Sequence, residues 1–408
     1  MSSQTKLLLI PCSGEETTDL ASSIFKILKE DYGLDNQVEL LSSQRRKDID
    51  KDMPKVHRHP LVADYFADGE VQVDIGGNEL KDVIRGKHIA LIEHLLTPVR
   101  KMHLEDEQRV SVNDHIMAVR GFLDVVSNVD TLQRTLACPY LAYVRSHSIE
   151  KYRKQSFFQF DSLKRMLIDF QKGGLDVLVT IDPHSIKASQ IAEELNMDFH
   201  AANPFQSGRA INPYKLGLTG EKAKDVPKKL RPFQERFTQL KGQYAPHLYI
   251  ISVDDGTEHR AENFVERAFL KSPPEEVYQR LAYLGKERVS YDRTNSTFKA
   301  FSHINERNID PEGIYIIIDD MFASGGTGMA AAGLFRAAGA KRVEVWTSHA
   351  VTMPAQHARA NERTHIDKVV CLDTIPQHSL LDLEYIPASA DLLAAELYKA
   401  HQRLVASR

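Results

Sequence analysis

The chain has 408 residues, of which 42% are hydrophobic, and its formal net charge is −4. Because domains of about 100–200 residues are usual, this length allows two hydrophobic cores. The near balance of 52 basic and 56 acidic residues produces no global field that would favour nucleic acid or an acidic membrane as a partner.

Cysteine content and the N-terminal segment indicate the compartment. Cys12, Cys138 and Cys371 are widely spaced, so they form neither a disulfide framework nor a zinc pattern. The segment Met1–Leu9 lacks the charged and apolar parts of a leader, and no apolar run approaches the ~18 residues of a membrane span. The sequence therefore predicts a soluble, cytoplasmic protein.

Apolar runs of strand length recur along the chain, and amphipathic stretches separate many of them. The expected strands are 6–11, 88–93, 175–181, 247–253, 313–318, 342–347 and 368–372. Helices are expected at 19–30, where Leu20, Ile24 and Leu28 recur at four-residue spacing, and at 328–338, which Gly339 would end. Alternating strands and helices predict the α/β class, with parallel sheets that are covered on both faces.

Two polar regions interrupt this alternation. Residues 34–59 contain "QRRKDIDKDMPK", and residues 203–244 contain "GEKAKDVPKKLRPFQERFTQLKG". Dense charge without apolar periodicity is typical of solvated surface, so both regions are interpreted as insertions or exposed hairpins.

The segment "IYIIIDDMFASGGTG" places two acids and a glycine-rich loop after an expected buried strand, Ile314–Ile318. Ligands of open α/β sheets bind at the carboxyl ends of strands, where Asp319 and Asp320 fall. One carboxylate can face a ribose diol while the other reaches a metal-bound water or a backbone amide. The glycines let the backbone turn tightly into a helix beginning near Thr327, and the N-terminus of that helix suits a phosphate.

Two familiar phosphate-binding motifs do not match this segment. No lysine follows the glycines, as a Walker loop requires, and the acids precede the glycines, contrary to a dinucleotide-binding turn. An ordinary capped helix after a strand remains as the structural alternative. Two carboxylates at a buried strand end are costly without a ligand or partner, which favours a site for a sugar phosphate.

"DDMFASGGT" resembles the phosphoribosyl pyrophosphate loop of type I phosphoribosyltransferases and of phosphoribosyl pyrophosphate synthetases. Further segments resemble the synthetases in family order: "FADGEVQVDI", "SVNDHIMAV", "CPYLAYVR", "VTIDPHS", "ISVDDG", "LGKERVSYDR", "RAAGAKRVEVWTSHAV" and "DTIPQHS". Because these matches run colinearly over nearly the whole chain, the sequence is identified as similar to the phosphoribosyl pyrophosphate synthetase (ribose-phosphate diphosphokinase) family, as a divergent member with insertions.

This resemblance implies two type I phosphoribosyltransferase-like domains, each with a mostly parallel central sheet flanked by helices. Residues 1–200, completed by 384–408, would form the ATP side, and 201–383, with the insertion near 203–244, would bind the sugar phosphate. The implied reaction moves the β,γ-diphosphoryl group of Mg·ATP to the anomeric hydroxyl of ribose 5-phosphate and releases AMP. The family also implies Mg²⁺ as cofactor, a homo-oligomer (dimer or hexamer), and neither nucleic acid nor membrane as partner.

The resemblance carries roles over to single residues of the ATP side. The ATP-binding residues would be Phe66, Asp68, Glu70, Arg145 and His147. Phe66 can stack on a base, and Arg145, expected at a strand end, can bridge phosphates, although it is otherwise a plain surface cation. After this arginine the family usually has Gln and then Asp, where this chain has Ser146 and His147.

The implied metal ligands are His184 and Asp254, with Asp182 as a ligand or as the group that orients His184. Mg²⁺ prefers oxygen ligands and water, and a lone histidine is more often structural than a ligand, so His184 rests on the resemblance alone.

Lys286 and Arg288 would be the catalytic residues. If their segment is extended, alternation aims both the same way, and they can stabilise charge that develops during the transfer. Without the resemblance, they are a solvated charge cluster.

On the sugar side, Asp319 and Asp320 would contact the ribose 2- and 3-hydroxyls. The cradle for the 5-phosphate would consist of Ser324, Gly325, Gly326, Thr327 and Gly328. The synthetases usually have a third acid in this loop, at the position of Ala323.

Three other functions stay open beside the leading one. The same chemistry could act on a larger 5-phosphoribosyl acceptor such as ADP-ribose, because Ala323 and the two insertions make room. A non-catalytic regulatory partner of active synthetases is a second, which the Lys286–Arg288 pair disfavours. A phosphoribosyltransferase that consumes the diphosphate is a third, which the doubled domain disfavours.

Overall fold

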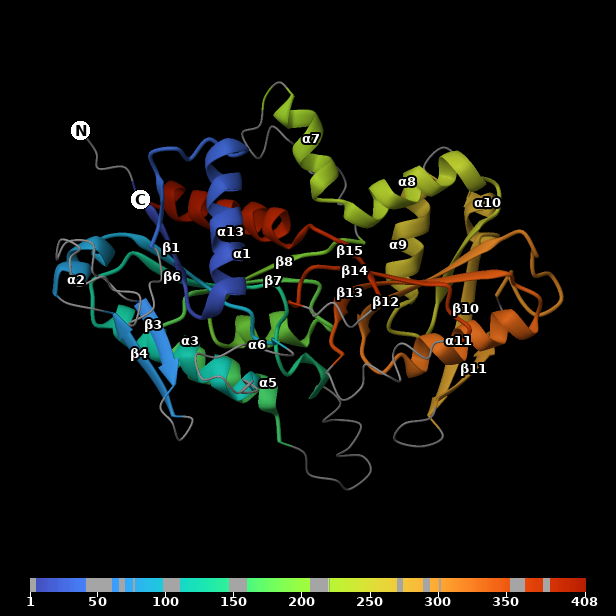
Figure 1. Cartoon of the computed structure of the whole chain (residues 1–408), viewed down its shortest axis with the longest axis horizontal. Coiled ribbons are helices and arrows are strands. Elements are labelled where there is room, and N and C mark those ends of the chain that lie inside the picture. Colours follow the sequence, from blue (N-terminus) through green and yellow to red (C-terminus); the bar gives the residue numbers. More distant parts are fainter. Residues whose placement is uncertain are drawn as a thin grey trace. The chain divides into compact units, whose positions relative to one another are not determined.

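The computed structural model in Figure 1 describes residues 5–41, 61–65, 70–75, 78–97, 111–146, 160–205, 219, 221–269, 274–288, 294–300, 302–352, 364–376 and 382–408. These residues divide into two compact units. Unit 1 holds the described residues up to Ala202 together with Ser389–Arg408, and unit 2 holds those from Asn203 to Ala388.

Unit 1 is built on a six-stranded, fully parallel sheet in the order β2-β1-β5-β6-β7-β8. Its strands are β1 (Leu7–Pro11), β2 (Val38–Leu40), β5 (His88–Ile92), β6 (Gln133–Cys138), β7 (Val177–Ile181) and β8 (Asp198–Ala202). Two more strands, β3 (Leu61–Tyr65) and β4 (Val71–Ile75), form a separate antiparallel pair.

Helices cover both faces of this sheet. They are α1 (Gly14–Glu30), α2 (Asn78–Ile84), α3 (Val112–Ser127), α5 (Ser162–Lys172), α6 (Lys187–Glu194) and α13 (Ser389–Ala406), with a short 3₁₀ turn, η2 (Val144–Ser146). The N-terminal helix α1 and the C-terminal helix α13 lie side by side on one face, and α3 and α5 lie on the other (Figure 1). The predicted stripe of Leu20, Ile24 and Leu28 is buried, which explains why α1 packs there.

Unit 2 is built on a seven-stranded sheet in the order β11-β10-β9-β12-β13-β14-β15, in which only β11 is antiparallel. Its strands are β9 (Leu248–Ser252), β10 (Leu281–Arg288), β11 (Thr294–Phe298), β12 (Ile314–Phe322), β13 (Arg342–Ala350), β14 (Lys368–Leu372) and β15 (Glu384–Ile386). Its helices are α7 (Lys222–Lys229), α8 (Pro232–Tyr244), α9 (Glu258–Ala268), α10 (Pro274–Tyr278) and α11 (Gly326–Ala337).

Aromatic side chains fill both faces of this second sheet. Trp346 of β13 packs against Phe233 and Phe237 of α8, with ring centroids 5.9 Å and 6.5 Å away. On the opposite face, Tyr315 of β12 lies 4.9 Å from Phe335 of α11. The predicted α/β class, with mostly parallel sheets flanked by helices, is therefore confirmed in both units.

The interpretation of 203–244 as solvated surface is wrong for its second half. Phe233 and Phe237 of α8 are fully buried, and their neighbours are polar because only one face of the helix meets the sheet. The start of the other polar region differs in the same way, since Leu34 and Val38 are buried and β2 pairs with β1. Most of the remainder, 42–59, lies outside the described residues.

Two boundaries depart from the expected ones. Strand β12 runs on through Asp319 and Asp320 to Phe322, because β13 continues to pair with it as far as Phe322 opposite Ala350. Strand β15 still pairs with β14, so the chain passes from unit 2 to unit 1 only at Ser389. In the described parts of the chain, every helix is too short or too polar to span a membrane.

Candidate active site

The sheet of unit 2 changes its direction of growth between β9 and β12. From β9 the chain proceeds outward to β10 and β11, and it then returns to place β12 on the other side of β9. Ligands of open α/β sheets bind in the crevice outside the carboxyl ends of strands at such a switch point. Ile318 pairs with Ser252, so Asp319 and Asp320 come level with the end of β9, and Asp254 follows that end.

The carboxylates at this point influence one another. Asp320 is 4% exposed, and its backbone N–H donates to Asp319 Oδ1 at 2.9 Å. Burial raises the pKa of Asp319 well above its ordinary range, and the neighbouring charges of Asp320 and Asp254 raise it further. Negative charge is thus concentrated where a ligand with hydroxyl donors or a cation would relieve the repulsion.

The loop that carries Asp254 is held by its own hydrogen bonds. Thr257 Oγ1 accepts from the backbone N–H groups of Val253 and Asp254 at 3.0 Å and 3.2 Å. In return, Asp254 Oδ1 accepts from the backbone N–H of Thr257 at 3.1 Å. Such side chain–backbone bonds fix a short turn, so the Asp254 carboxylate has a defined position beside β12.

The glycine-rich loop leads directly into α11. Gly325 has φ +77°, in the left-handed region, and it is the N-cap residue of the helix. The first N–H groups of a helix have no partner within it, so those of Gly326, Thr327 and Gly328 suit an anion. Thr352 Oγ1 donates to the carbonyl oxygen of Ala323 at 2.7 Å, which anchors the loop from the end of β13.

The predicted phosphate residues differ in their surroundings. Ser324, Gly326 and Thr327 are half-buried at the turn and the first residues of α11. Gly328 is buried, and a Cβ there would lie 3.3 Å from Cγ2 of Val345. Close packing of α11 on β13 is therefore a sufficient reason for glycine at this position.

Two cations near this site were missed in the sequence. The positive charge of Arg260 on α9 partly offsets the rise in the pKa of Asp319, and its guanidinium lies 5.5 Å from the ring centroid of Phe205. Lys299, just after β11, pairs with Asp255 and Glu258. A cation in the first turn of a helix that follows an acidic strand end is the signal that could have indicated Arg260.

The predicted catalytic residues lie on a hairpin at the same edge of the sheet. Strand β10 pairs with β9 only through Leu281–Tyr283, and beyond that point it pairs only with β11, up to Arg288 opposite Thr294. Lys286 and Arg288 therefore stand on a strand that continues past the end of β9. The backbone is extended at both positions, which is the condition that the sequence-based interpretation required.

In unit 1, Asp182 and His184 follow the carboxyl end of β7. Asp182 is 2% exposed, and its φ of +39° is uncommon for a residue other than glycine. Its backbone N–H donates to the carbonyl of Ala202 at 2.7 Å. Uncommon backbone angles of this kind cluster at functional sites. The role of Asp182 as a metal ligand, or as the group that orients His184, stays a prediction.

The predicted ATP residues are only partly described. Glu70 is exposed just before β4, and Arg145 is exposed in the 3₁₀ turn η2. The expectation that Arg145 ends a strand is wrong. Strand β6 stops at Cys138, and Tyr143 has a left-handed φ of +61°, which is incompatible with strand backbone. Phe66, Asp68 and His147 lie outside the described residues.

The carboxylates of unit 2 suit a divalent cation only if a bound substrate and water supply further oxygen ligands. Within the described ranges no three His, Cys, Asp or Glu side chains come together to hold a metal ion, and the predicted set divides between unit 1 (Asp182, His184) and unit 2 (Asp254). Mg²⁺ is usually bound through one or two carboxylates together with substrate phosphates and water. The oxygen-rich, mutually repelling carboxylates beside β12 match that description.

Unit 1 has its own switch point, between β1 and β5, and the carboxylate of Glu93 lies there. Glu93, directly after β5, accepts from Ser13 Oγ at 2.5 Å and lies 2.9 Å from Nδ1 of His115. All three side chains are buried, and Ser13 is the N-cap residue of α1. The two units thus differ at their switch points: unit 2 has a glycine-rich loop there, and unit 1 has a buried carboxylate that is hydrogen-bonded within the unit.

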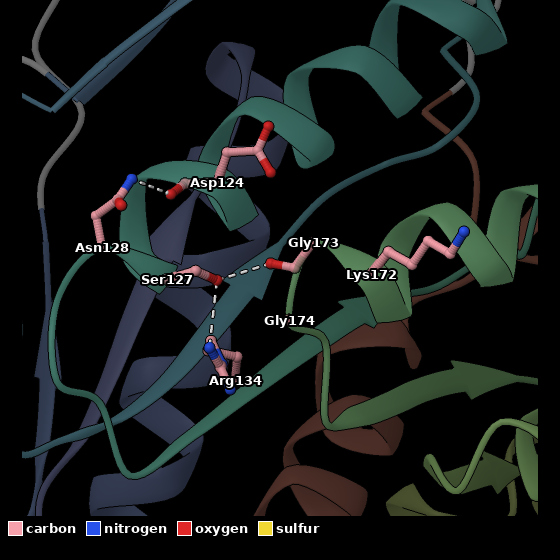
Figure 2. Close-up of a pocket in the computed structure, with 7 residues that line it drawn as sticks. All are labelled: Asp124, Ser127, Asn128, Arg134, Lys172, Gly173 and Gly174. Atoms are coloured by element: carbon pink, nitrogen blue, oxygen red, sulfur yellow. Dashed lines mark hydrogen bonds between the residues drawn. The ribbon is translucent and has the colours of Figure 1, made fainter.

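An open depression of about 440 Å³ on unit 1 is lined by residues that include Ser127, Arg134 and Lys172, whose side chains Figure 2 draws. Arg134 donates to Ser127 Oγ and is paired with Asp176, at 3.2 Å and 3.1 Å. The depression lies at the start of β6, away from the carboxyl ends of the strands, so it does not belong to the candidate site.

Comparison with known proteins connects this architecture to one group of enzymes. No family model matches the chain. It is 25% identical over 346 residues to a ribose-phosphate pyrophosphokinase of Prochlorococcus marinus, covering 84% of each chain. The corresponding protein of Nostoc is 22% identical over 390 residues, covering 94% of this chain and 97% of its own.

A solved structure agrees with the fold. The phosphoribosylpyrophosphate synthetase from Mycobacterium smegmatis superposes with a TM-score of 0.62 at 17% identity, covering 98% of this chain and 99% of that one. The resemblance found in the sequence motifs is therefore confirmed.

Proposed function

We propose that the chain is a divergent ribose-phosphate pyrophosphokinase and that it transfers the β,γ-diphosphoryl group of Mg·ATP to ribose 5-phosphate; its likeness to proteins of that name over most of its length supports this. The products are phosphoribosyl pyrophosphate and AMP. The observation that carries this proposal is the meeting of Asp254, Asp319 and Asp320 with a left-handed glycine and a helix N-terminus at one switch point.

The acceptor is held by two kinds of group. The carboxylates of Asp319 and Asp320 accept hydrogen bonds from the 2- and 3-hydroxyls of the ribose, which compensates for the burial of Asp320 and the partial burial of Asp319. The 5-phosphate of the ribose lies against the turn Ser324–Gly328, and its oxygens accept hydrogen bonds from the first N–H groups of α11. Arg260 limits the charge repulsion among the carboxylates.

In the transfer, the anomeric hydroxyl oxygen attacks the β-phosphorus and loses its proton. The bond between this phosphorus and the oxygen that bridges to the α-phosphorus breaks, and AMP leaves with that oxygen. Lys286 and Arg288, on the strand that extends past β9, stabilise the charge that develops on the transferred group. Asp254 in unit 2 is the proposed carboxylate for a Mg²⁺ ion that would neutralise the charge of the triphosphate when bound, and Asp182 and His184 in unit 1 are proposed metal ligands by resemblance.

ATP binds to residues of unit 1. Arg145, exposed in its turn, and Glu70, exposed before β4, are the described members of this proposed set. Phe66, Asp68 and His147 complete it by resemblance. The assignment of ATP to unit 1 and of the sugar phosphate to unit 2, with the expected boundary at 384 moved to Ser389, is part of the same proposal, as is a dimeric or hexameric homo-oligomer.

One observation supports a second acceptor. Ala323 carries no acid, and its carbonyl is bonded to Thr352, so the loop offers only a methyl group where the synthetases usually have a carboxylate. A larger 5-phosphoribosyl compound such as ADP-ribose is therefore the alternative substrate.

The deciding experiment measures AMP release from Mg·ATP with ribose 5-phosphate, with ADP-ribose and with no acceptor, with mass detection of the product. Lys286→Ala, purified in the same way, controls for contaminating activity. AMP together with phosphoribosyl pyrophosphate supports the proposal, and a product only with ADP-ribose supports the alternative. No AMP with any acceptor contradicts both and favours a non-catalytic regulatory protein.

A further inference from the structure

A lysine between two carboxylates ties the root of the β10–β11 hairpin to the loop that carries Asp254. Lys299 follows β11 directly, its Nζ lies 2.6 Å from Oε1 of Glu258, and it also bonds to Asp255. Asp255 is in the loop after β9, and Glu258 is the first residue of α9. The ion pairs therefore connect the hairpin to the switch point itself.

Hydrogen bonds at the same level fix the backbone of this root. The N–H of Lys299 donates to the carbonyl of Tyr283 at 2.9 Å, and the N–H of Tyr283 donates to Ser302 Oγ at 3.0 Å. The hydroxyl of Tyr283 donates to Glu262 on α9 at 2.9 Å. Since Tyr283 pairs with Ser252 at the end of β9, the root is the last point at which the main sheet supports the hairpin.

Beyond this root, β10 continues from Leu284 to Arg288, and among the described strands it pairs there only with β11. Five extended residues span about 16 Å, so a small rotation at the root becomes a large displacement at its far end. A misplacement of about 1 Å at a reacting group can cost about a hundredfold in rate.

We propose that Lys299, held by Asp255 and Glu258, is a positioning residue for catalysis. It orients the strand that bears Lys286 and Arg288 relative to the carboxylates at the switch point. This inference rests on the proposed function, because it acts through those two residues. A purely stabilising role accounts poorly for the pair with Asp255, since Asp255 is 88% exposed and exposed ion pairs contribute little to stability; the pair with Glu258, which is 26% exposed, anchors the lysine.

The test compares Lys299→Met with Lys299→Arg and with a matched control, Lys341→Met. Lys341 pairs with Glu312 at 2.8 Å on the surface of the same unit, at the amino ends of β12 and β13. Lys299→Met should lower kcat about ten- to a hundredfold, while KM for ribose 5-phosphate stays within about twofold. Lys299→Arg should restore most of kcat because arginine pairs with carboxylates, and Lys341→Met should leave kcat unchanged.

A double variant separates this inference from the proposed function. If Lys299 acts through the hairpin, Lys299→Met should cost little further turnover in the Lys286→Ala background. A Lys286→Ala protein with normal kcat would contradict the proposed catalytic role of Lys286, whereas a wild-type protein that releases no AMP would contradict the proposed function. Two outcomes would overturn the inference alone. In the first, kcat falls strongly in Lys286→Ala, but Lys299→Met lowers kcat no more than Lys341→Met does. In the second, Lys299→Met lowers kcat by the same factor in the wild-type protein and in Lys286→Ala. Should Lys299→Met not fold, Asp255→Asn replaces it, and an unchanged kcat there would also overturn the inference.

Discussion

The substitution Gly325→Ala tests most directly whether the loop before α11 binds phosphate. Gly325 has φ +77°, and a Cβ there would lie 2.9 Å from Cζ of Phe322, whose side chain is buried. The left-handed conformation costs a residue with a Cβ about 1–2 kcal/mol. Crowding against a buried ring adds about 1–3 kcal/mol, so the expected loss in the free energy of unfolding is about 2–5 kcal/mol.

A second glycine supplies the matched control. Gly86 in unit 1 has φ +68°, and a Cβ there would meet no atom within 4 Å. Gly86→Ala therefore carries only the conformational cost, about 1–2 kcal/mol. Any excess in Gly325→Ala reports the crowding within the loop.

The assay combines urea unfolding with the kinetics of ribose 5-phosphate. Gly325→Ala should lose about 1–3 kcal/mol more than Gly86→Ala. Its KM for ribose 5-phosphate should rise at least about tenfold, about 1.4 kcal/mol of binding, because the first N–H groups of α11 move. Gly86→Ala should leave KM unchanged. Equal destabilisation in the two variants together with an unchanged KM would refute both the packing argument and the phosphate role of this loop.

Three further predictions concern other charged and titratable groups. Asp319→Asn should increase the free energy of unfolding at pH 7 and weaken use of ribose 5-phosphate. The stability should rise because the raised pKa of Asp319 means that its carboxylate destabilises the folded state at that pH. Lower stability together with an unchanged KM would contradict this prediction. Burial lowers the pKa of His88 to about 3 and that of His401 to about 4, so stability is complete above the ordinary pKa near 6.5 and is lost as pH falls towards 4. Urea unfolding should show a loss of about 2 kcal/mol per histidine at pH 5, and His401→Asn should flatten that dependence. His184→Ala should shift the Mg²⁺ dependence of AMP release, and an effect confined to the melting temperature would make His184 structural.

The local pattern of the sequence was enough to predict the α/β class and the place of the acids and glycines between a buried strand and a helix. Apolar runs such as 368–372 and 342–347 mark strands because a parallel strand is buried on both faces. Acids followed by glycines indicated a ligand because buried charge needs compensation and a left-handed turn needs glycine, as Gly325 shows.

What only the tertiary structure decided is which distant segments become neighbours. Asp254 meets Asp319 because β9 pairs with β12, and Lys299 reaches Asp255 across 44 residues of chain. Polar composition likewise concealed α8, since two phenylalanines on one face suffice to bury it against Trp346. Sequence periodicity shows which face of a segment is buried, whereas strand order and loop closure determine which segments it packs against. The sequence therefore identified the motif of the candidate site, and only the fold showed which groups lie around it.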